Sequence, residues 1–219
     1  MKKKILVVGG TKGIGQSVVD LMTQYECIVL SRTESVDKNH FVCDVLKDDL
    51  PEIENLSGLV YCPGSINLKP FHRLSEEDFL NDFHVNVLGA VRVMQKYFRE
   101  LKRNKGSIVL FGTVAANQGM PFHASIAASK GGLEALARSL AAEWAPSIRV
   151  NIVNPSLTET TLAEGLLNTE QKKENAAMRH PLKKIGQPID IAKAVQLCLE
   201  NEWMTGQTIG VDGGMSTLK

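Results

Sequence analysis

Short, almost uninterrupted apolar runs alternate with longer amphipathic segments along the chain of 219 residues. A strand covered on both faces stays apolar throughout, whereas a strand with one wet face alternates apolar and polar residues. Parallel neighbours also need crossover connections, which are usually helical. The pattern predicts an α/β fold, with one doubly wound parallel sheet of about seven strands and helices on both faces. Strands are expected at residues 4–8, 27–31, 40–43, 59–62, 107–111, 148–153 and 208–211.

The segments between these runs carry apolar residues at helical spacing. Ser75, with Asp78 three residues later, resembles the capping box that begins many helices. Only about eight residues separate the second and third strands, fewer than a helical crossover needs. Residues 32–39 are therefore expected to form a loop that leaves one face of that sheet edge thinly covered. Helices are expected at residues 13–23, 75–83, 85–102, 125–144 and 189–199.

Charge and composition exclude several classes of partner. A net charge of +1 argues against nucleic acid and against an anionic membrane surface. No apolar run approaches a membrane span, and the first run stops at Gly9, too early for a signal peptide. We therefore expect a cytoplasmic protein without membrane association. The four cysteines are not spaced as metal ligands are, so no metal site is expected. We interpret them as reduced and mostly buried thiols: Cys27, Cys43, Cys62 and Cys198.

A glycine-rich segment follows the first expected strand and opens the first expected helix. Glycines there let the backbone turn tightly and approach a pyrophosphate, and the helix N-terminus supplies free N–H groups. A glycine triplet alone is a weak signal, but this position between strand and helix makes it specific. A merely structural turn is the less favoured alternative. The expected phosphate-binding residues are Gly9, Thr11, Lys12, Gly13, Ile14 and Gly15.

The end of the second strand indicates which dinucleotide binds. NAD sites usually offer a carboxylate there for the ribose hydroxyls, but this chain reads Ser31-Arg32. Lys12 adds a second cation in the glycine loop, and two cations suit a 2′-phosphate. The alternative is that Lys12 and Arg32 are ordinary solvated charges. We expect residues 1–219 to form a single Rossmann-type domain that binds NADP(H), with contributions from Ser31 and Arg32.

With these motifs in place, the sequence resembles the classical short-chain dehydrogenase/reductase family over nearly its whole length. The family's glycine motif corresponds to the segment from Val8 to Gly15, with Val8 in place of a threonine. Further matches lie at residues 205–207 and 211–214. The resemblance implies additional cofactor contacts near adenine, ribose, nicotinamide and phosphates, made by Asp44, Val45, Gly64, Lys130, Pro155 and Thr160.

The resemblance also shows where this chain departs from the family's chemistry. Asn86 and Lys130 match the family's catalytic asparagine and lysine, but Thr113 stands at the serine position and Ile126 at the tyrosine position. In the family a phenol gives its proton to the substrate oxygen, which isoleucine cannot do. Loss of a positioned general acid typically costs about 10²–10⁴-fold in rate. The resemblance implies that Thr113 orients a carbonyl oxygen and that Asn86 holds a water behind Lys130.

His123 is a candidate replacement for the missing proton donor. It precedes Ile126 and Lys130 by one and two helical turns, so the three share a face if the helix begins there. Histidine titrates near neutral pH and suits proton transfer. The alternative is that His123 merely belongs to a substrate-side loop with Pro121 and Phe122.

Three functions remain open, because the fold alone does not decide among them. The first is an NADP(H)-dependent oxidoreductase acting on a small carbonyl or alcohol through an atypical proton donor. The others are a cofactor-binding protein or sensor without redox activity, and a non-redox isomerase or dehydratase. Thr113, Asn86 and Lys130 favour the first, whereas Ile126 favours the others. Residues 156–188 are expected to set substrate specificity.

The two longest expected helices, at residues 85–102 and 125–144, carry more apolar surface than a small monomer usually exposes. The resemblance implies that these helices pair between subunits. We therefore expect a homo-oligomer, either a dimer or a tetramer.

Overall fold

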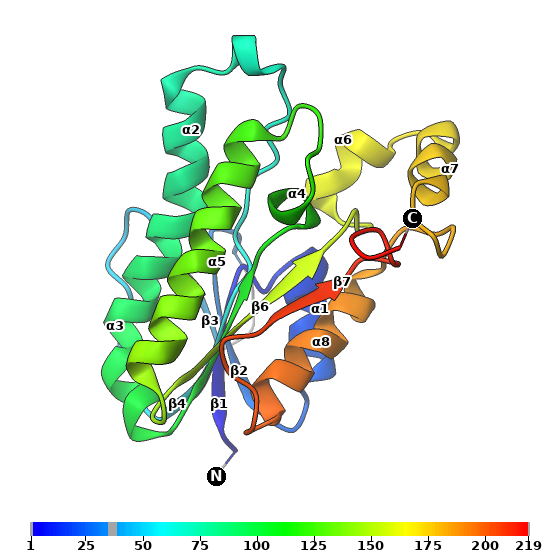
Figure 1. The fold of residues 1–219 in the computed structure, drawn as a ribbon. Coiled ribbons are helices and arrows are strands. Elements are labelled where there is room, and N and C mark those ends of the chain that lie inside the picture. Colours follow the sequence, from blue (N-terminus) through cyan, green and yellow to red (C-terminus); the bar gives the residue numbers. More distant parts are fainter. Residues whose placement is uncertain (1, 35–38, 219) are drawn as a thin grey trace.

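Seven strands form one parallel sheet, as the apolar runs predict (Figure 1). The computed structural model describes residues 2–34 and 39–218. The order across the sheet is β3-β2-β1-β4-β5-β6-β7, so the chain begins inside the sheet and builds first one edge and then the other. The strands are β1 (Lys4–Val8), β2 (Glu26–Ser31), β3 (His40–Val42), β4 (Leu56–Tyr61), β5 (Ser107–Phe111), β6 (Arg149–Pro155) and β7 (Thr208–Val211).

Helices cover both faces of this sheet (Figure 1). On one face, α1 (Gly13–Leu21) and α8 (Pro188–Glu200) pack together over one hydrophobic cluster. On the other, α3 (Gly89–Arg103) and α5 (Ala124–Trp144) cover the larger cluster. The predicted α/β fold is therefore confirmed. In α3 the spacing of three and four residues places one face in the core, through Ala90, Val93, Met94, Tyr97 and Leu101.

The shorter helical elements differ from the expectation. The capping box predicted at Ser75 begins α2 (Glu76–Phe83), but a π-helical turn, η2 (His84–Leu88), joins α2 to α3 without a break. Such turns are frequent at functional sites, and this one holds Asn86. Five further elements are too short or too polar to show an apolar period: α4 (Val114–Asn117), α6 (Glu164–Leu167), α7 (Glu170–Met178), η1 (Phe71–Arg73) and η3 (Thr161–Ala163).

β3 forms a thinly covered edge of the sheet. It pairs in parallel with β2 although only a short segment connects them. Phe41 is 40% exposed and Val42 is 58% exposed. This exposure agrees with the absence of a helical crossover predicted from the short connection. Within the expected loop, residues 35–38 lie outside the described residues.

Within residues 2–34 and 39–218, no helix has both the length and the apolar character needed to cross a membrane. Those residues also contain no group of three or more His, Cys, Asp or Glu that could hold a metal ion. The four cysteines are free thiols. Burial raises the pKa of the Cys62 thiol to about 12, so this thiol stays protonated near neutral pH.

Candidate active site

A cleft of about 530 Å³ opens at the carboxyl ends of the central strands. Its walls include Cys62 directly after β4, Phe111 at the end of β5 and Pro155 at the end of β6. In doubly wound folds, ligands bind at this edge of the sheet. Of the residues predicted from the sequence, the cleft brings together Ile14, Gly64, Thr113, His123, Lys130, Pro155 and Thr160.

The glycine loop leads from β1 into α1 beside this cleft. Gly9 and Gly13 have φ angles of 77° and 55°, in the left-handed region that favours glycine. A Cβ on Gly15 would lie 2.2 Å from the carbonyl oxygen of Gly9, so only glycine permits this approach. Thr11 lies in the turn, and Lys12 occupies the N-cap of α1 without a side-chain cap. The N–H groups of the first turn therefore remain available to an anion.

Ser31 and Arg32 stand where β2 leaves the sheet, next to the glycine loop. The Ser31 hydroxyl donates to the carbonyl oxygen of Thr33 at 3.0 Å and lies 2.8 Å from Nε2 of His40. Ser31 is therefore held by the turn that presents Arg32. Arg32 and Lys12 are both exposed, and neither forms an ion pair with any other residue the structure describes.

Asp44 and Val45 follow β3 at the same edge of the sheet. Asp44 Oδ1 accepts from the backbone N–H of Leu46 at 3.0 Å, which fixes the turn. Val45 is buried, and its carbonyl oxygen accepts from Nη1 of Arg92 at 2.8 Å. These contacts place both residues on the side of the sheet where β2 and β3 end, outside the lining of the cleft.

Lys130 reaches the floor of the cleft from α5. It is 7% exposed, and its Nζ donates to the carbonyl oxygen of Phe111 at 2.8 Å. A Cβ on Gly64 would lie 3.6 Å from this Nζ, so the chain at Gly64 runs beside the ammonium. Burial lowers the pKa of Lys130 to about 8, although the nearby Cys62 and Asp82 act in the opposite direction.

Asn86 lies behind the cleft wall, fully buried in η2. Its Nδ2 donates to the hydroxyl oxygens of Ser65 and Ser129, each at 3.1 Å. Ser129 Oγ in turn donates to the carbonyl oxygen of Ile126 at 3.1 Å. Asn86 Oδ1 has no hydrogen-bond partner within the described part of the chain. The contacts tie Asn86 to the turn of α5 that carries Ile126 and Lys130.

Thr113, His123 and Ile126 face the same cleft. Thr113 is the N-cap of α4, where its hydroxyl oxygen accepts from the N–H of Ala115 at 3.3 Å and keeps its own hydrogen to donate. His123 is the N-cap residue of α5, so the helix begins directly after it. Its Nδ1 lies 2.6 Å from the carbonyl oxygen of Pro121. That contact places a proton on Nδ1 and leaves Nε2 as the second ring nitrogen.

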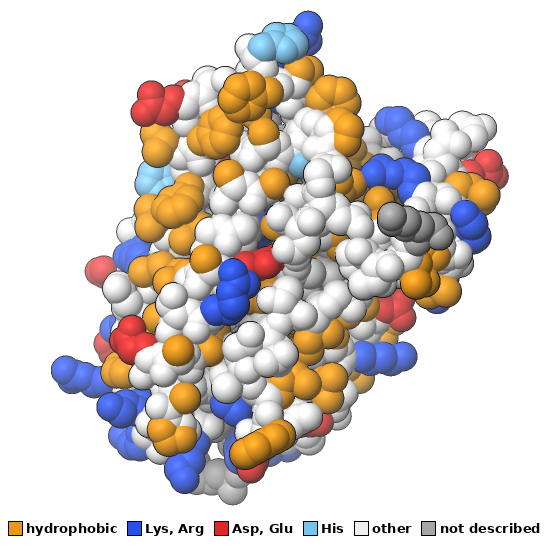
Figure 2. Space-filling view, viewed as in Figure 1, with side chains coloured by type: hydrophobic (Ala, Val, Ile, Leu, Met, Phe, Trp, Pro, Cys, Tyr) orange, Lys and Arg blue, Asp and Glu red, His pale blue; other side chains and the backbone are white. Residues whose placement is uncertain are grey.

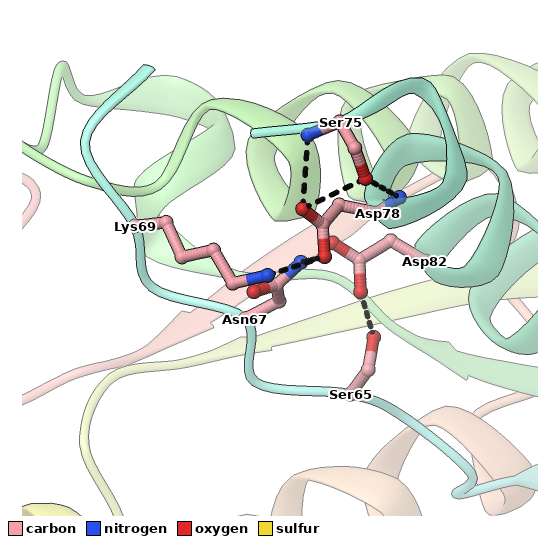
Figure 3. A network of polar contacts seen from close by, with 6 residues as sticks. All are labelled: Ser65, Asn67, Lys69, Ser75, Asp78 and Asp82. Atoms are coloured by element: carbon pink, nitrogen blue, oxygen red, sulfur yellow. Dashed lines mark hydrogen bonds and ion pairs between the residues drawn. The ribbon is translucent and has the colours of Figure 1, made fainter. Parts of the chain in front are cut away.

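A network of polar contacts ties α2 to the segment that follows β4 (Figure 3). Lys69 and Asn67 donate to Oδ1 of Asp78 at 2.6 and 3.1 Å, and Asp78 Oδ2 accepts from the N–H of Ser75 at 3.0 Å. The hydrogen bond from Lys69 is the main reason that the pKa of Asp78 lies well below its usual range. These contacts fix the segment that carries Gly64 over the cleft.

Two polar pairs at the cleft are not evident from the sequence. Ser65 lines the cleft and donates to Oδ1 of the buried Asp82 at 2.6 Å. Ser156 also lines the cleft, 2.8 Å from Nε2 of His180, whose Nδ1 lies 2.8 Å from the carbonyl oxygen of Ala176. Each pair joins residues far apart in sequence. The one available signal is that Ser156 stands where the family's motif has glycine.

Comparison with known proteins gives matches over nearly the whole chain. A family model described as enoyl-(acyl carrier protein) reductase matches residues 10–216. The mouse (Mus musculus) 3-oxoacyl-[acyl-carrier-protein] reductase is 33% identical, with 98% of this chain and 98% of the relative aligned. Carbonyl reductase family member 4 of Danio rerio is 33% identical over 100% of both chains. Among solved structures, ElxO with NADP bound has a TM-score of 0.87 at 25% identity, covering 98% of this chain and 99% of that one.

Proposed function

Since this chain belongs to the classical short-chain dehydrogenase/reductase family, we propose that it is an NADP(H)-dependent oxidoreductase acting on a small carbonyl or alcohol. One observation carries the proposal. The uncapped N-terminus of α1 meets the cleft where Gly15 packs directly against the carbonyl of Gly9. A side chain on Gly15 would push the helix away from the loop, so this close packing supports a pyrophosphate site at the helix N-terminus over a merely structural turn.

When bound, the nicotinamide cofactor supplies or accepts the hydride, and the chain orients it and handles the proton. The backbone N–H groups of residues 9–15 would hold the pyrophosphate. Lys130 fits the ribose hydroxyls, because its ammonium has N–H groups beyond the one donated to Phe111. The remaining proposed contacts are made by Asp44 and Val45 at adenine and by Gly64, Pro155 and Thr160 near the nicotinamide.

Lys12 and Arg32 support NADP(H) over NAD(H). Arg32 directly follows β2 and Lys12 is the N-cap residue of α1, after the neighbouring strand β1, and both side chains are exposed. β2 ends at Ser31 and Arg32 follows it, so the carboxylate that binds the ribose hydroxyls in NAD sites is absent from both positions. A guanidinium and an ammonium can both donate to a 2′-phosphate. ElxO, the structural relative at 25% identity, has been solved with NADP bound.

The proton donor of the proposed reaction is atypical. Ile126 presents an apolar side chain to the cleft at the position where the family carries a phenol. The Thr113 hydroxyl can donate to a substrate oxygen and orient it, but an alkyl alcohol is too weak an acid to replace a phenol unaided. His123 is one candidate donor, because it lines the cleft one turn before Ile126.

The cleft supports a small and largely apolar substrate. Residues 156–188 contribute Leu157, Leu162 and Leu166 to its walls, and the segment after β4 contributes Ile66 and Leu68. Apolar walls with a few convergent polar groups are typical of small-molecule sites. Residues 156–188 therefore remain the proposed source of specificity.

We also propose that the protein is a homo-oligomer. Figure 2 shows hydrophobic side chains gathered over α2 and the adjoining part of α5. Leu80, Phe83 and Leu88 are among the exposed large hydrophobic residues. A Cβ on Gly131 of α5 would meet nothing within 4 Å, so a second helix could approach closely there. A shared apolar surface of this kind suits two-fold pairing of subunits.

The cofactor assignment can be tested by comparing NADPH and NADH affinities in calorimetry. Wild-type protein should bind NADPH more tightly. The double variant Lys12→Ala, Arg32→Ala should lose about 10- to 100-fold in NADPH affinity, since a charge-assisted hydrogen bond contributes about 1.5–3 kcal/mol. NADH affinity should hold. The matched control, Lys102→Ala with Arg103→Ala at the end of α3, removes the same charges and should leave both affinities unchanged. Equal wild-type affinities for the two cofactors would reject NADP(H) preference.

A further inference from the structure

Ser65 and Asp82 form a hydrogen-bonded pair (Figure 3). Ser65 belongs to the segment after β4 and lines the cleft. Its Oγ donates to Oδ1 of Asp82 at 2.6 Å, and Asp82, on α2, is 2% exposed. Among the described residues, the Ser65 hydroxyl is the hydrogen-bond donor to this carboxyl group, and Lys130 at the cleft also interacts with it electrostatically.

The pair lies beside the groups proposed to handle the substrate. Ser65 Oγ accepts from Asn86 Nδ2 at 3.1 Å, and the same amide reaches Ser129, which is bonded to the carbonyl of Ile126. A Cβ on the neighbouring Gly64 would lie 3.6 Å from Nζ of Lys130. Ser65 therefore faces the cleft next to the turn of α5 from which the phenol is missing.

Asp82 is not fully satisfied by its surroundings. Its Oδ2 and the Oδ1 of Asn86, one helical turn later, are buried and have no hydrogen-bond partner among the residues described. A buried carboxyl oxygen without a hydrogen-bond partner is costly, and a catalytic role is one reason for a protein to keep such a group.

Asp78, one turn earlier on α2, provides the contrast. Its Oδ1 accepts from Lys69 and Asn67, and its Oδ2 accepts from Ser75, so both oxygens are used to fasten the loop. Figure 3 shows both carboxylates in one view. Both oxygens of Asp78 therefore stabilise the loop. In Asp82, one oxygen accepts from the Ser65 hydroxyl at the cleft and the other has no hydrogen-bond partner among the described residues.

We propose that Ser65 contacts the reacting oxygen and relays its proton to and from Asp82, in place of the phenol that Ile126 cannot supply. This inference rests on the proposed oxidoreductase function. In the oxidation direction, the substrate hydroxyl gives its proton to Ser65 Oγ as Ser65 passes its own proton to Asp82, and the hydride leaves the same carbon for NADP⁺. In the reduction direction, each transfer reverses, and the protonated carboxyl of Asp82 supplies the proton. Ser65 is the catalytic residue and Asp82 its positioning and proton-holding partner.

The test uses NADPH with 2,3-butanedione for reduction and NADP⁺ with 2,3-butanediol for oxidation. Ser65→Ala should lower kcat by about 10²-fold or more in both directions, since a positioned proton donor contributes about that factor. Ser65→Thr, which restores a hydroxyl, should recover most of the loss. Asp82→Asn keeps an acceptor for Ser65 but cannot hold the proton, so kcat should fall while KM for the substrate stays unchanged.

Glu77→Gln, which neutralises an exposed carboxylate on the same helix, is the matched control and should keep the wild-type kcat. Wild-type turnover in Ser65→Ala, or in Asp82→Asn, overturns the relay. A loss of kcat in His123→Ala or His180→Gln, with Ser65→Ala unaffected, assigns the proton to a histidine and also overturns it. Wild-type protein that binds NADPH but turns over neither probe rejects the relay and leaves cofactor binding intact. Wild-type protein that does not bind NADPH rejects the proposed function itself.

Discussion

Lys130 is a buried charged side chain at the cleft. Its Nζ is buried, donates to the carbonyl of Phe111 and lies near Asp82, which acts to raise its pKa. Burial is the larger influence and brings the pKa down to about 8. An exposed lysine stays charged well above that pH. The charge that would hold the ribose hydroxyls therefore titrates close to the range in which enzymes work.

Lys130→Met gives a stability test of this titration. The folded-state pKa lies below the ordinary value of 10.5. Between about pH 8 and 10 the unfolded chain therefore holds more protons, and the lysine's contribution to unfolding free energy rises with pH. Wild-type protein should gain about 2–3 kcal/mol relative to Lys130→Met over this range. Urea unfolding at pH 7, 8, 9 and 10 measures the difference, and a constant difference contradicts the lowered pKa.

Single residues were predictable where they belong to a local motif. The family resemblance indicated Lys130 and Thr113, helical spacing indicated His123, and all three are found together in the cleft. Ser65 and Asp82 were not predictable. The residues next to Ser65 and Asp82 in sequence form no motif that predicts this hydrogen bond. It forms because α2 packs beside the segment after β4.

The turn from β1 into α1 requires glycine at position 15. Gly15→Ala would bring a Cβ against the Gly9 carbonyl, and both groups are fixed to the backbone. The helix must then move away from the loop, so NADPH affinity should fall at least about tenfold. Fluorescence titration measures this affinity. Gly119→Ala, whose Cβ would meet nothing within 4 Å, is the control and should bind as wild type does. Equal affinities for the two variants would contradict the proposed phosphate site.

Among the secondary-structure elements, strands were predicted best. β1, β5 and β7 have the expected bounds, because a strand buried on both faces is marked by its apolar run. β4 begins at Leu56 instead of residue 59, since Ser57 and Gly58 interrupt the apolar pattern. α7 escaped prediction because Ala176 is its one buried residue, and a polar helix shows no apolar period. The π turn depends on tertiary packing around Asn86 and has no sequence signature of its own.

At the scale of the whole molecule, the apolar surface over α2 and α5 predicts how the protein assembles. Phe83→Glu should convert the proposed oligomer to monomers, because a carboxylate buried between two copies of this surface is unfavourable. Phe41→Glu on the exposed edge strand β3 adds the same charge elsewhere and should leave the assembly unchanged. Light scattering at micromolar concentration distinguishes the two results. A wild-type monomer under these conditions would rule out the proposed assembly.

β1 precedes the other strands of the sheet in sequence, yet it lies in the interior of the finished sheet. Leu6 pairs with Ile28 of β2 on one side and with Leu59 of β4 on the other. Until β4 is available, β1 can pair with β2 but its other edge stays open. An open strand edge can pair with another chain. The partly made chain is thus open to aggregation at this edge, which chaperones that bind nascent chains would protect.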